Sequence, residues 1–334
     1  MTSDSAKRPN PPASNEWQPV ENQTIDSPVE NDATTPSLNL ARPKKAPWLH
    51  LLLLLMTIVT TMFWGHLHYA AFLANFSSEL PQVSWMHGAW YSVTILAILG
   101  SHEFGHYFAC RYYRVDASLP YFLPAPFLTG TFGAVIRIRE RIPTKPMLFD
   151  IGIAGPIAGF IIAVPALFVG LWLSQLTELP DADVAFITLG EPLLFQGAAW
   201  LIWGTPPDGY SINLHPMGFA AWFGLLATAL NLFPIAQLDG GHITYAALGA
   251  RSTKITVLGL FVVLGLTFLS PSWFLWAALL LAMVIFGGAR HPRTLDDHIP
   301  LDRARLWWAA GAALIFVLCF TPAPVDIGVL INEP

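Results

Sequence analysis

The residues best suited to chemistry form the pentapeptide HEFGH at positions 102–106, near the end of a long apolar stretch. His102 and His106 are four residues apart. On an α-helix they therefore differ by about 40° around the axis and about 6 Å along it, so both can direct a ring nitrogen at one metal ion. Glu103 lies about 100° round the helix, where its carboxylate suits a water on the metal better than the metal itself. The spacing predicts a metal site with an adjacent general base.

A third ligand is expected from another acid or histidine in an apolar segment, because zinc sites of this HExxH type take a further ligand from elsewhere in the chain. Asp239 fits this requirement, since it ends a later apolar run with the sequence NLFPIAQLDGGH. Asp150, at the mouth of another run, is a weaker candidate, because an acid at a helix boundary is usually solvated or balances the helix N-terminus. Asp239 is therefore the predicted third ligand.

The sequence around Asp239 suggests how it turns toward a metal. Pro234 removes an amide donor and kinks or stops a helix, and Gly240 and Gly241 relieve the backbone, so the carboxylate can leave the regular helical direction. His242 completes LDGGH. We expect it to support the site and not to be a fourth ligand, because a catalytic zinc has three protein ligands and one open position.

The composition indicates the surroundings of this site. Of the 334 residues, 54% are hydrophobic and 12% are charged, and the mean hydropathy is +0.51. Soluble domains carry about 25% charged residues, so this chain is predicted to be an all-α polytopic membrane protein. About seven apolar runs are candidate spans: 48–67, 89–110, 148–173, 217–238, 255–269, 273–288 and 306–320. An eighth run, 184–203, is interrupted by Glu191 and Pro192.

The basic residues favour seven spans with the N-terminus in the cytoplasm. With that topology all 17 Lys and Arg lie in the tail or in inner loops, and the outer loops 68–88, 174–216 and 321–334 contain none, as the positive-inside rule requires. If 184–203 also crossed, six basic residues would lie outside. We therefore interpret 184–203 as interfacial or re-entrant.

HEFGH together with NLFPIAQLDGGH resembles the site-2 protease family of intramembrane zinc metalloproteases, whose signatures are HExxH and NxxPxxxLDG. The resemblance covers roughly residues 85–245. It implies hydrolysis of peptide bonds within transmembrane segments of membrane-protein substrates, near the cytoplasmic side. It also implies one Zn²⁺ held by His102, His106 and Asp239, with Glu103 as the general base and Asn231 near the substrate or the oxyanion. An interhelical hydrogen bond is the alternative role for Asn231.

A short β-hairpin is expected between the second and third spans. In TGTFGAVIRIR, residues 129–139, apolar and basic residues alternate as in a strand, and the preceding YFLPAPFL is its expected partner. A re-entrant hairpin of this kind has an edge that can pair with an unfolded substrate segment. An interfacial loop whose arginines meet lipid phosphates is the other reading. In the third span, Gly155 and Gly159 form a GxxxG motif that we assign to packing against the catalytic helices.

The chain divides into three predicted regions: a disordered cytoplasmic tail at 1–45, a metalloprotease core at 46–246 and C-terminal transmembrane helices at 247–334. The tail is rich in Pro, Ser, Asn and acids, unlike a transit peptide. A bacterial plasma membrane is the expected location, with a plastid membrane as the alternative. The expected partners are transmembrane substrates and the lipid bilayer, not nucleic acid, and the sequence does not indicate the oligomeric state.

Two other functions use the same residue types. A metal or proton transporter also places His, Glu and Asp in the membrane, but it would favour repeated halves with broken helices, and neither HEFGH nor LDGGH is duplicated in the sequence. A non-catalytic homologue that only binds membrane proteins is less consistent with an intact Glu103.

Overall fold

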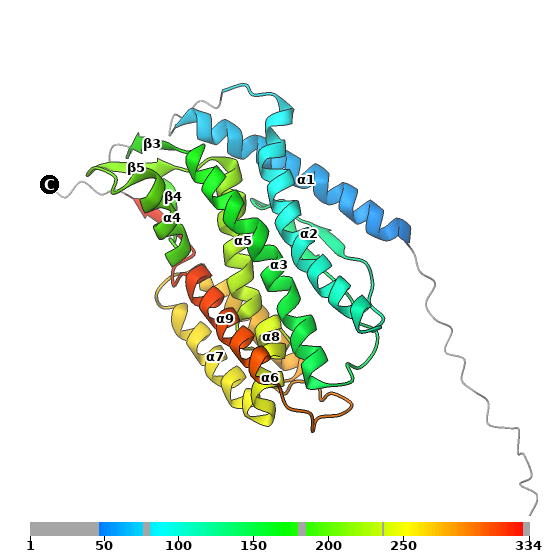
Figure 1. The fold of residues 1–334 in the computed structure, drawn as a ribbon. Helices are drawn as coiled ribbons and strands as arrows, with labels where there is room; N and C mark the ends of the chain where they lie inside the picture. Colours follow the sequence, from blue (N-terminus) through cyan, green and yellow to red (C-terminus); the bar gives the residue numbers. More distant parts are fainter. Residues whose placement is uncertain (1–46, 76–80, 180–184, 236, 330–334) are drawn as a thin grey trace, which may run out of the picture. The chain divides into compact units, whose positions relative to one another are not determined.

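A computed structural model describes residues 47–75, 81–179, 185–235 and 237–329, and the predicted tail at 1–45 lies outside these residues. This part of the chain is mostly helical, with three pairs of short strands (Figure 1). The α-helices are α1 Pro47–Ala74, α2 Ala89–Tyr112, α3 Lys145–Trp172, α4 Leu193–Trp203, α5 Pro216–Leu232, α6 Asp239–Leu248, α7 Ser252–Leu266, α8 Trp273–Gly287 and α9 Arg303–Cys319. The strands are β1 Tyr121–Pro124, β2 Thr131–Val135, β3 Gln175–Glu178, β4 Ala185–Leu189, β5 Tyr210–Asn213 and β6 Val325–Val329. Short 3₁₀ turns are η1 Trp85–Gly88 and η2 Gly249–Arg251.

Helix α3 lies between α2 and α5 and forms the centre of the packing (Figure 1). Small residues allow the close approach: a Cβ added at Gly170 of α3 would lie 2.3 Å from Gly218 of α5. The largest buried cluster joins Leu167 of α3 with Trp222 and Leu225 of α5. The three helices therefore form a rigid support for the HEFGH motif on α2.

One end of the helical part carries two of the three small sheets. Strand β3 pairs with β5, and β4 pairs with β6, both antiparallel. The Asn213 side chain donates to the Phe72 carbonyl at the end of α1, and Ser270, between α7 and α8, donates to the Val325 carbonyl. Four segments thus gather at this end: those that connect α1 to α2, α3 to α5 and α7 to α8, and the segment after α9.

The opposite end carries the remaining connections. Lys145, at the start of α3, donates to the Asp297 carbonyl at 2.7 Å, and Tyr245 of α6 donates to the Asp297 carboxylate at 2.8 Å. Arg305, at the start of α9, pairs with Asp150 of α3. The start of α3 and the 288–302 connection therefore lie at the end away from these two sheets, whereas the β1–β2 turn extends along α1, where Thr60 donates to the Gly130 carbonyl. This alternation of ends is what an up-and-down membrane bundle requires.

Among the described residues, three helical stretches are long and apolar enough to cross a membrane: Pro47–Ala74, Lys145–Trp172 and Asp239–Leu266, the last of which comprises α6, η2 and α7 with a turn at Gly249. Helix α2 has 24 residues, but its polar metal motif lowers its hydropathy. Helix α4 has only 11 residues, about 16 Å of helix against a hydrocarbon core of about 30 Å. The stretch at 185–203 thus contains β4 and one short helix, and its interfacial or re-entrant placement stays a prediction.

The predicted fourth run, 217–238, is wrong at its C-terminal end. Helix α5 stops at Leu232, Phe233 to Leu238 are not helical among the described residues, and a separate helix, α6, begins at Asp239. Pro234 cannot donate a helical hydrogen bond, which accounts for the break. Asp239 thus belongs to the first turn of a new helix and not to the end of the old one.

Candidate metal centre

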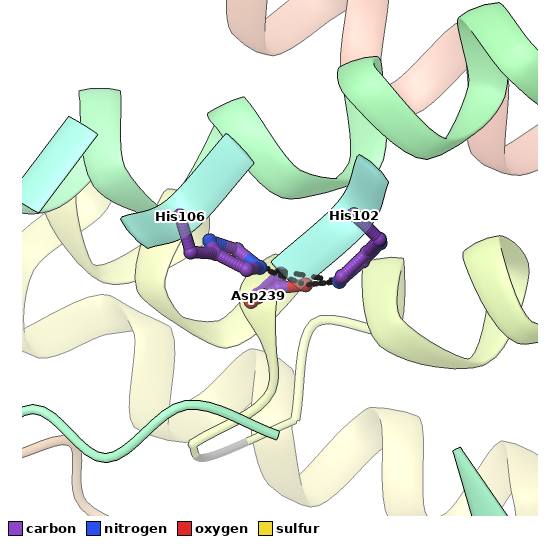
Figure 2. A group of neighbouring side chains, drawn as sticks. All are labelled: His102, His106 and Asp239. Carbon is purple, nitrogen blue, oxygen red and sulfur yellow. Dashed lines mark hydrogen bonds and ion pairs between the residues drawn. The ribbon is translucent and has the colours of Figure 1, made fainter. Parts of the chain in front are cut away.

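The three predicted ligands converge on one point (Figure 2). His102 Nε2 and His106 Nε2 of α2 are 3.1 Å apart. Asp239 Oδ2 lies 3.2 Å from the first and 3.3 Å from the second. Both histidines are buried, and the Asp239 side chain is only 14% exposed. His102 and His106, one helical turn apart, therefore meet Asp239 inside the protein. Asp239 lies 133 positions along the chain from His106.

The hydrogen bond on the other side of the His106 ring orients this ligand. His106 Nδ1 lies 2.7 Å from the Ile151 carbonyl of α3. Because a carbonyl only accepts, Nδ1 carries the proton and Nε2 keeps a lone pair directed at the cluster. A ligating histidine with its second nitrogen bonded to a backbone carbonyl is the common arrangement in metal sites.

The donor set and its spacing fit zinc. Two imidazole nitrogens and one carboxylate oxygen are typical zinc ligands, and ligands about 2.0–2.1 Å from a tetrahedral zinc are about 3.3 Å apart. The observed separations of 3.1, 3.2 and 3.3 Å match this value. Three protein ligands leave a fourth position for water or substrate, as in catalytic zinc sites.

Glycines of α3 make the room that the histidine rings need. A Cβ at Gly155 would lie 2.1 Å from His106 Nε2, and a Cβ at Gly159 would lie 3.2 Å from His102 Cβ. The GxxxG motif was predicted to pack α3 against the catalytic helices, and it does so at the ligands themselves. Gly105 continues this contact from α2, since its Cβ would meet the Ala154 carbonyl at 2.5 Å.

The glycine after Asp239 has a different role from the predicted one. Gly240 lies within α6, and its φ is not among the positive values in the described chain. A Cβ at Gly240 would lie 2.0 Å from the Leu232 carbonyl at the end of α5. Gly240 therefore supplies space for α6 to begin against α5, which brings Asp239 to the histidines.

Glu103 and Asn231 lie at the same site. Glu103 Oε1 is 4.0 Å from His102 Nε2, outside the three-ligand group. Asn231 Nδ2 is 3.3 Å from His102 Nε2. A cavity of about 240 Å³ is lined by both residues, by the three ligands and by 134–136 of the β2 region. This arrangement can hold a metal with a water beside Glu103.

Strands β1 and β2 form the predicted antiparallel pair, with Phe122 opposite Ala134 and Leu123 opposite Gly133. In the described residues this sheet has two strands, so the second edge of β2 has no strand partner there. The β2 region lines the cavity, which puts that hairpin beside the metal ligands.

His242 is outside the three-ligand group and makes a different bond. Its Nδ1 lies 2.5 Å from His291 Nε2, and His291 Nδ1 lies 2.6 Å from the Pro292 carbonyl. His291 Nδ1 must donate to that carbonyl, so His242 donates to His291. Burial lowers the pKa of His291, which favours the neutral form that this bond uses. His242 thus borders the cavity without joining the three-ligand group, and its supporting role stays a prediction.

Two groups at the site had no sequence signal. The carbonyl of Ile151 that orients His106 belongs to the backbone, so the residue type at this position does not predict it. Asp150 is expected from the sequence to be solvated or to balance a helix N-terminus, but in the structure it is ion-paired with Arg305. A glycine pair facing a histidine pair at i, i+4 spacing is a pattern that does indicate the role of Gly155 and Gly159.

Comparisons with known proteins agree with this geometry. Residues 90–270 match peptidase family M50. A protein of Arabidopsis thaliana named probable zinc metalloprotease EGY1, chloroplastic, is 37% identical over 179 residues, which are 52% of this chain and 32% of that protein. Another from the same plant, named probable zinc metalloprotease EGY2, chloroplastic, is 31% identical over 242 residues, 71% of this chain and 42% of that protein. No solved structure matches the chain.

The matched region contains the three convergent residues, Glu103 and Asn231. HEFGH and NLFPIAQLDGGH both fall within residues 90–270, whereas α8 and α9 lie beyond them. The chain covers about a third to two fifths of the length of these relatives.

Proposed function

Because the chain belongs to peptidase family M50, we propose that it is an intramembrane zinc metalloprotease that hydrolyses peptide bonds within transmembrane segments of membrane proteins. The observation that carries the proposal is the convergence of His102, His106 and Asp239, with Glu103 beside them but not among the ligands. The names of the plant relatives, zinc metalloproteases, support the same activity.

The protein residues have distinct roles in this proposal. His102, His106 and Asp239 hold Zn²⁺, which when bound acts as a Lewis acid toward water and the scissile carbonyl. Glu103 accepts a proton from the attacking water and later delivers it to the leaving amine. Asn231, at the wall of the cavity, donates from Nδ2 to the oxygen that develops negative charge. The buried ligands and the packing of α2, α3 and α5 keep these groups in position.

The membrane topology we propose has seven spans: α1, α2, α3, α5, the α6–α7 unit, α8 and α9. Three of these have the length and hydropathy of spans, and the alternation of the connections between two ends supports the rest. The 113–144 and 288–302 connections hold many of the basic residues, so we assign that end to the inner face. Cleavage then occurs in the inner part of the bilayer.

We propose that the substrate binds in extended form along the free edge of β2, beside Glu103, in a hairpin that re-enters the membrane from the inner face.

A bacterial plasma membrane stays our proposed location, with the tail at 1–45, the core at 46–246 and the C-terminal helices at 247–334. The relatives named chloroplastic support a plastid membrane as the alternative.

Zinc dependence tests the proposal directly. Purified full-length protein in lipid nanodiscs is expected to bind one zinc and to cleave a single-span reporter. Removing zinc with a chelator should abolish cleavage, and restoring zinc should recover it, because without the metal nothing polarises the carbonyl. Mass spectrometry of the products locates the cut. Equal cleavage by the zinc-free protein would refute the proposal, and zinc transport into sealed vesicles would support the transporter instead.

The second test concerns the substrate. A helix hides its carbonyls in its own hydrogen bonds, so a stretch that unwinds easily near the inner face should be required. Replacing Gly or polar residues there by Leu and Ala is expected to slow cleavage of the reporter by about tenfold or more, since each Gly-to-Ala change stabilises helix by about 1 kcal/mol. The same replacements in the outer half of the span serve as the control. Unchanged cleavage of the inner-half variant would contradict an extended substrate.

A further inference from the structure

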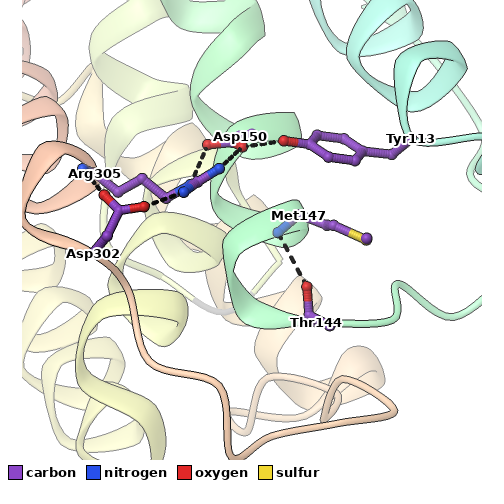
Figure 3. A network of polar contacts seen from close by, with 6 residues as sticks. All are labelled: Tyr113, Thr144, Met147, Asp150, Asp302 and Arg305. Atoms are coloured by element: carbon purple, nitrogen blue, oxygen red, sulfur yellow. Dashed lines mark hydrogen bonds and ion pairs between the residues drawn. The ribbon is translucent and has the colours of Figure 1, made fainter.

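A polar network joins three helices at the inner end of the protein (Figure 3). Arg305 at the start of α9 forms a forked pair with Asp150 of α3, with Nη2 to Oδ2 at 2.6 Å and Nε to Oδ1 at 2.9 Å. The Tyr113 hydroxyl, immediately after α2, donates to the same Asp150 carboxylate. Asp302 accepts from the Arg305 backbone at 2.8 Å and also bonds its guanidinium. Two parallel bonds fix the orientation of a carboxylate more tightly than a single one does.

Asp150 is directly joined to a residue that touches the metal site. The next residue, Ile151, accepts the 2.7 Å hydrogen bond from His106 Nδ1. Both residues are in the first two turns of α3, which begins at a Thr144 cap, so the backbone between the carboxylate and the carbonyl is rigid. Tyr113 ends the helix that carries His106. Asp150 therefore holds α2 and α3 in the relative position that the hydrogen bond of His106 needs.

We propose that Arg305 is a positioning residue for the metal site, acting through Asp150 to hold the Ile151 carbonyl against His106. Arg305 does not touch a ligand, and α9 lies outside the 90–270 region that matches the family. Through Arg305, the C-terminal helix α9 thus helps to hold the metal site of the core in position. This inference rests on the proposed zinc site.

The fork geometry of the guanidinium, more than its charge, should matter. The side chains of Arg305 and Asp150 are 28% and 25% exposed, so solvent screens the ion pair and reduces its direct contribution to stability. A lysine keeps the charge but cannot bond both carboxylate oxygens with a planar fork. Loss of the fork frees the start of α3 to shift, and the Ile151 carbonyl shifts with it.

The test measures zinc affinity by competition with a chelator, using full-length protein in nanodiscs. Partners that bond a ligand directly change metal affinity by about 10–100-fold when mutated, so for the more remote Arg305→Gln we expect the zinc Kd to rise by about 3- to 10-fold. Arg305→Lys should give an intermediate value. The double variant that combines Asp150→Asn with Arg305→Gln should bind zinc no more weakly than the weaker-binding of the two single variants. The reason is that both substitutions remove the same constraint.

Arg303→Gln is the matched control, since this arginine is exposed in the same turn of α9 and has no ion pair within the described chain. Its zinc affinity should equal the wild-type value. Wild-type affinity in Arg305→Gln, or a drop that only follows a lower unfolding temperature of the zinc-free protein, would overturn the proposal. If Arg305→Gln does not fold, the zinc affinities of Arg305→Lys and Tyr113→Phe are measured instead. Wild-type zinc affinity in both of these variants would overturn the proposal. A wild-type protein that binds no zinc would instead refute the proposed function.

Discussion

Glu103→Gln is expected to lower the rate of reporter cleavage by about 10²–10⁴-fold, the usual contribution of a general base, while the zinc content stays at one per chain. Glutamine has nearly the same shape as glutamate but cannot accept the proton of the attacking water. Glu103 is also not one of the three convergent ligands, so its charge is not needed to hold the metal. Cleavage rate and zinc content are measured on the same preparation.

Glu178→Gln provides the control, because Glu178 lies in β3, at the end with the small sheets, and bonds Tyr210 there. Its cleavage rate should equal the wild-type rate. Equal rates for Glu103→Gln and wild type would exclude Glu103 as the base. Zinc loss in Glu103→Gln would mean that Glu103 is a ligand and that the assignment of the three-ligand group is incomplete.

The convergence of the three candidate ligands was predictable because each has a local cause. His102 and His106 are one helical turn apart, and this spacing needs only a helix. Asp239 follows Pro234, which stops α5 at Leu232. Asp239 was thus predicted as an acid at the end of an apolar run, although the helical part of that run was assigned six residues too many.

Partnerships between distant residues left no such pattern. Asp150 and Arg305 are 155 positions apart, and each alone is an ordinary charged residue near a helix start. The pairing of β4 with β6 likewise joins two short segments with no periodic signal. Gly240 was assigned to backbone freedom, but it serves packing against the Leu232 carbonyl. The sequence shows where a glycine is, but not whether its small size or its backbone freedom is required at that position.

Gly155→Ala is expected to remove zinc binding with little change in the fold. The added Cβ would lie 2.1 Å from His106 Nε2. The ring must move by about 1.3 Å to reach an ordinary contact of 3.4 Å. As the end of a side chain it can do so by giving up its bond to the Ile151 carbonyl, without displacing α2 or α3. The same movement takes Nε2 away from His102 and Asp239. Disturbing only the partner of a ligand costs about 10–100-fold in metal affinity, so displacing the ligand should raise the zinc Kd by more than about 100-fold.

Two other helical glycines calibrate this effect. A Cβ at Gly159 would lie 3.2 Å from His102 Cβ, which a shift of a few tenths of an ångström relieves, so Gly159→Ala should weaken zinc binding by less than about tenfold, the lower bound for direct partners of a ligand. Gly311 of α9 has nothing within 4 Å of an added Cβ, and Gly311→Ala should bind zinc as the wild type does. The expected order of zinc Kd is therefore Gly155→Ala, then Gly159→Ala, then Gly311→Ala. If Gly155→Ala kept wild-type zinc affinity, His106 Nε2 would not be a ligand in the position described, because no tetrahedral site tolerates that displacement.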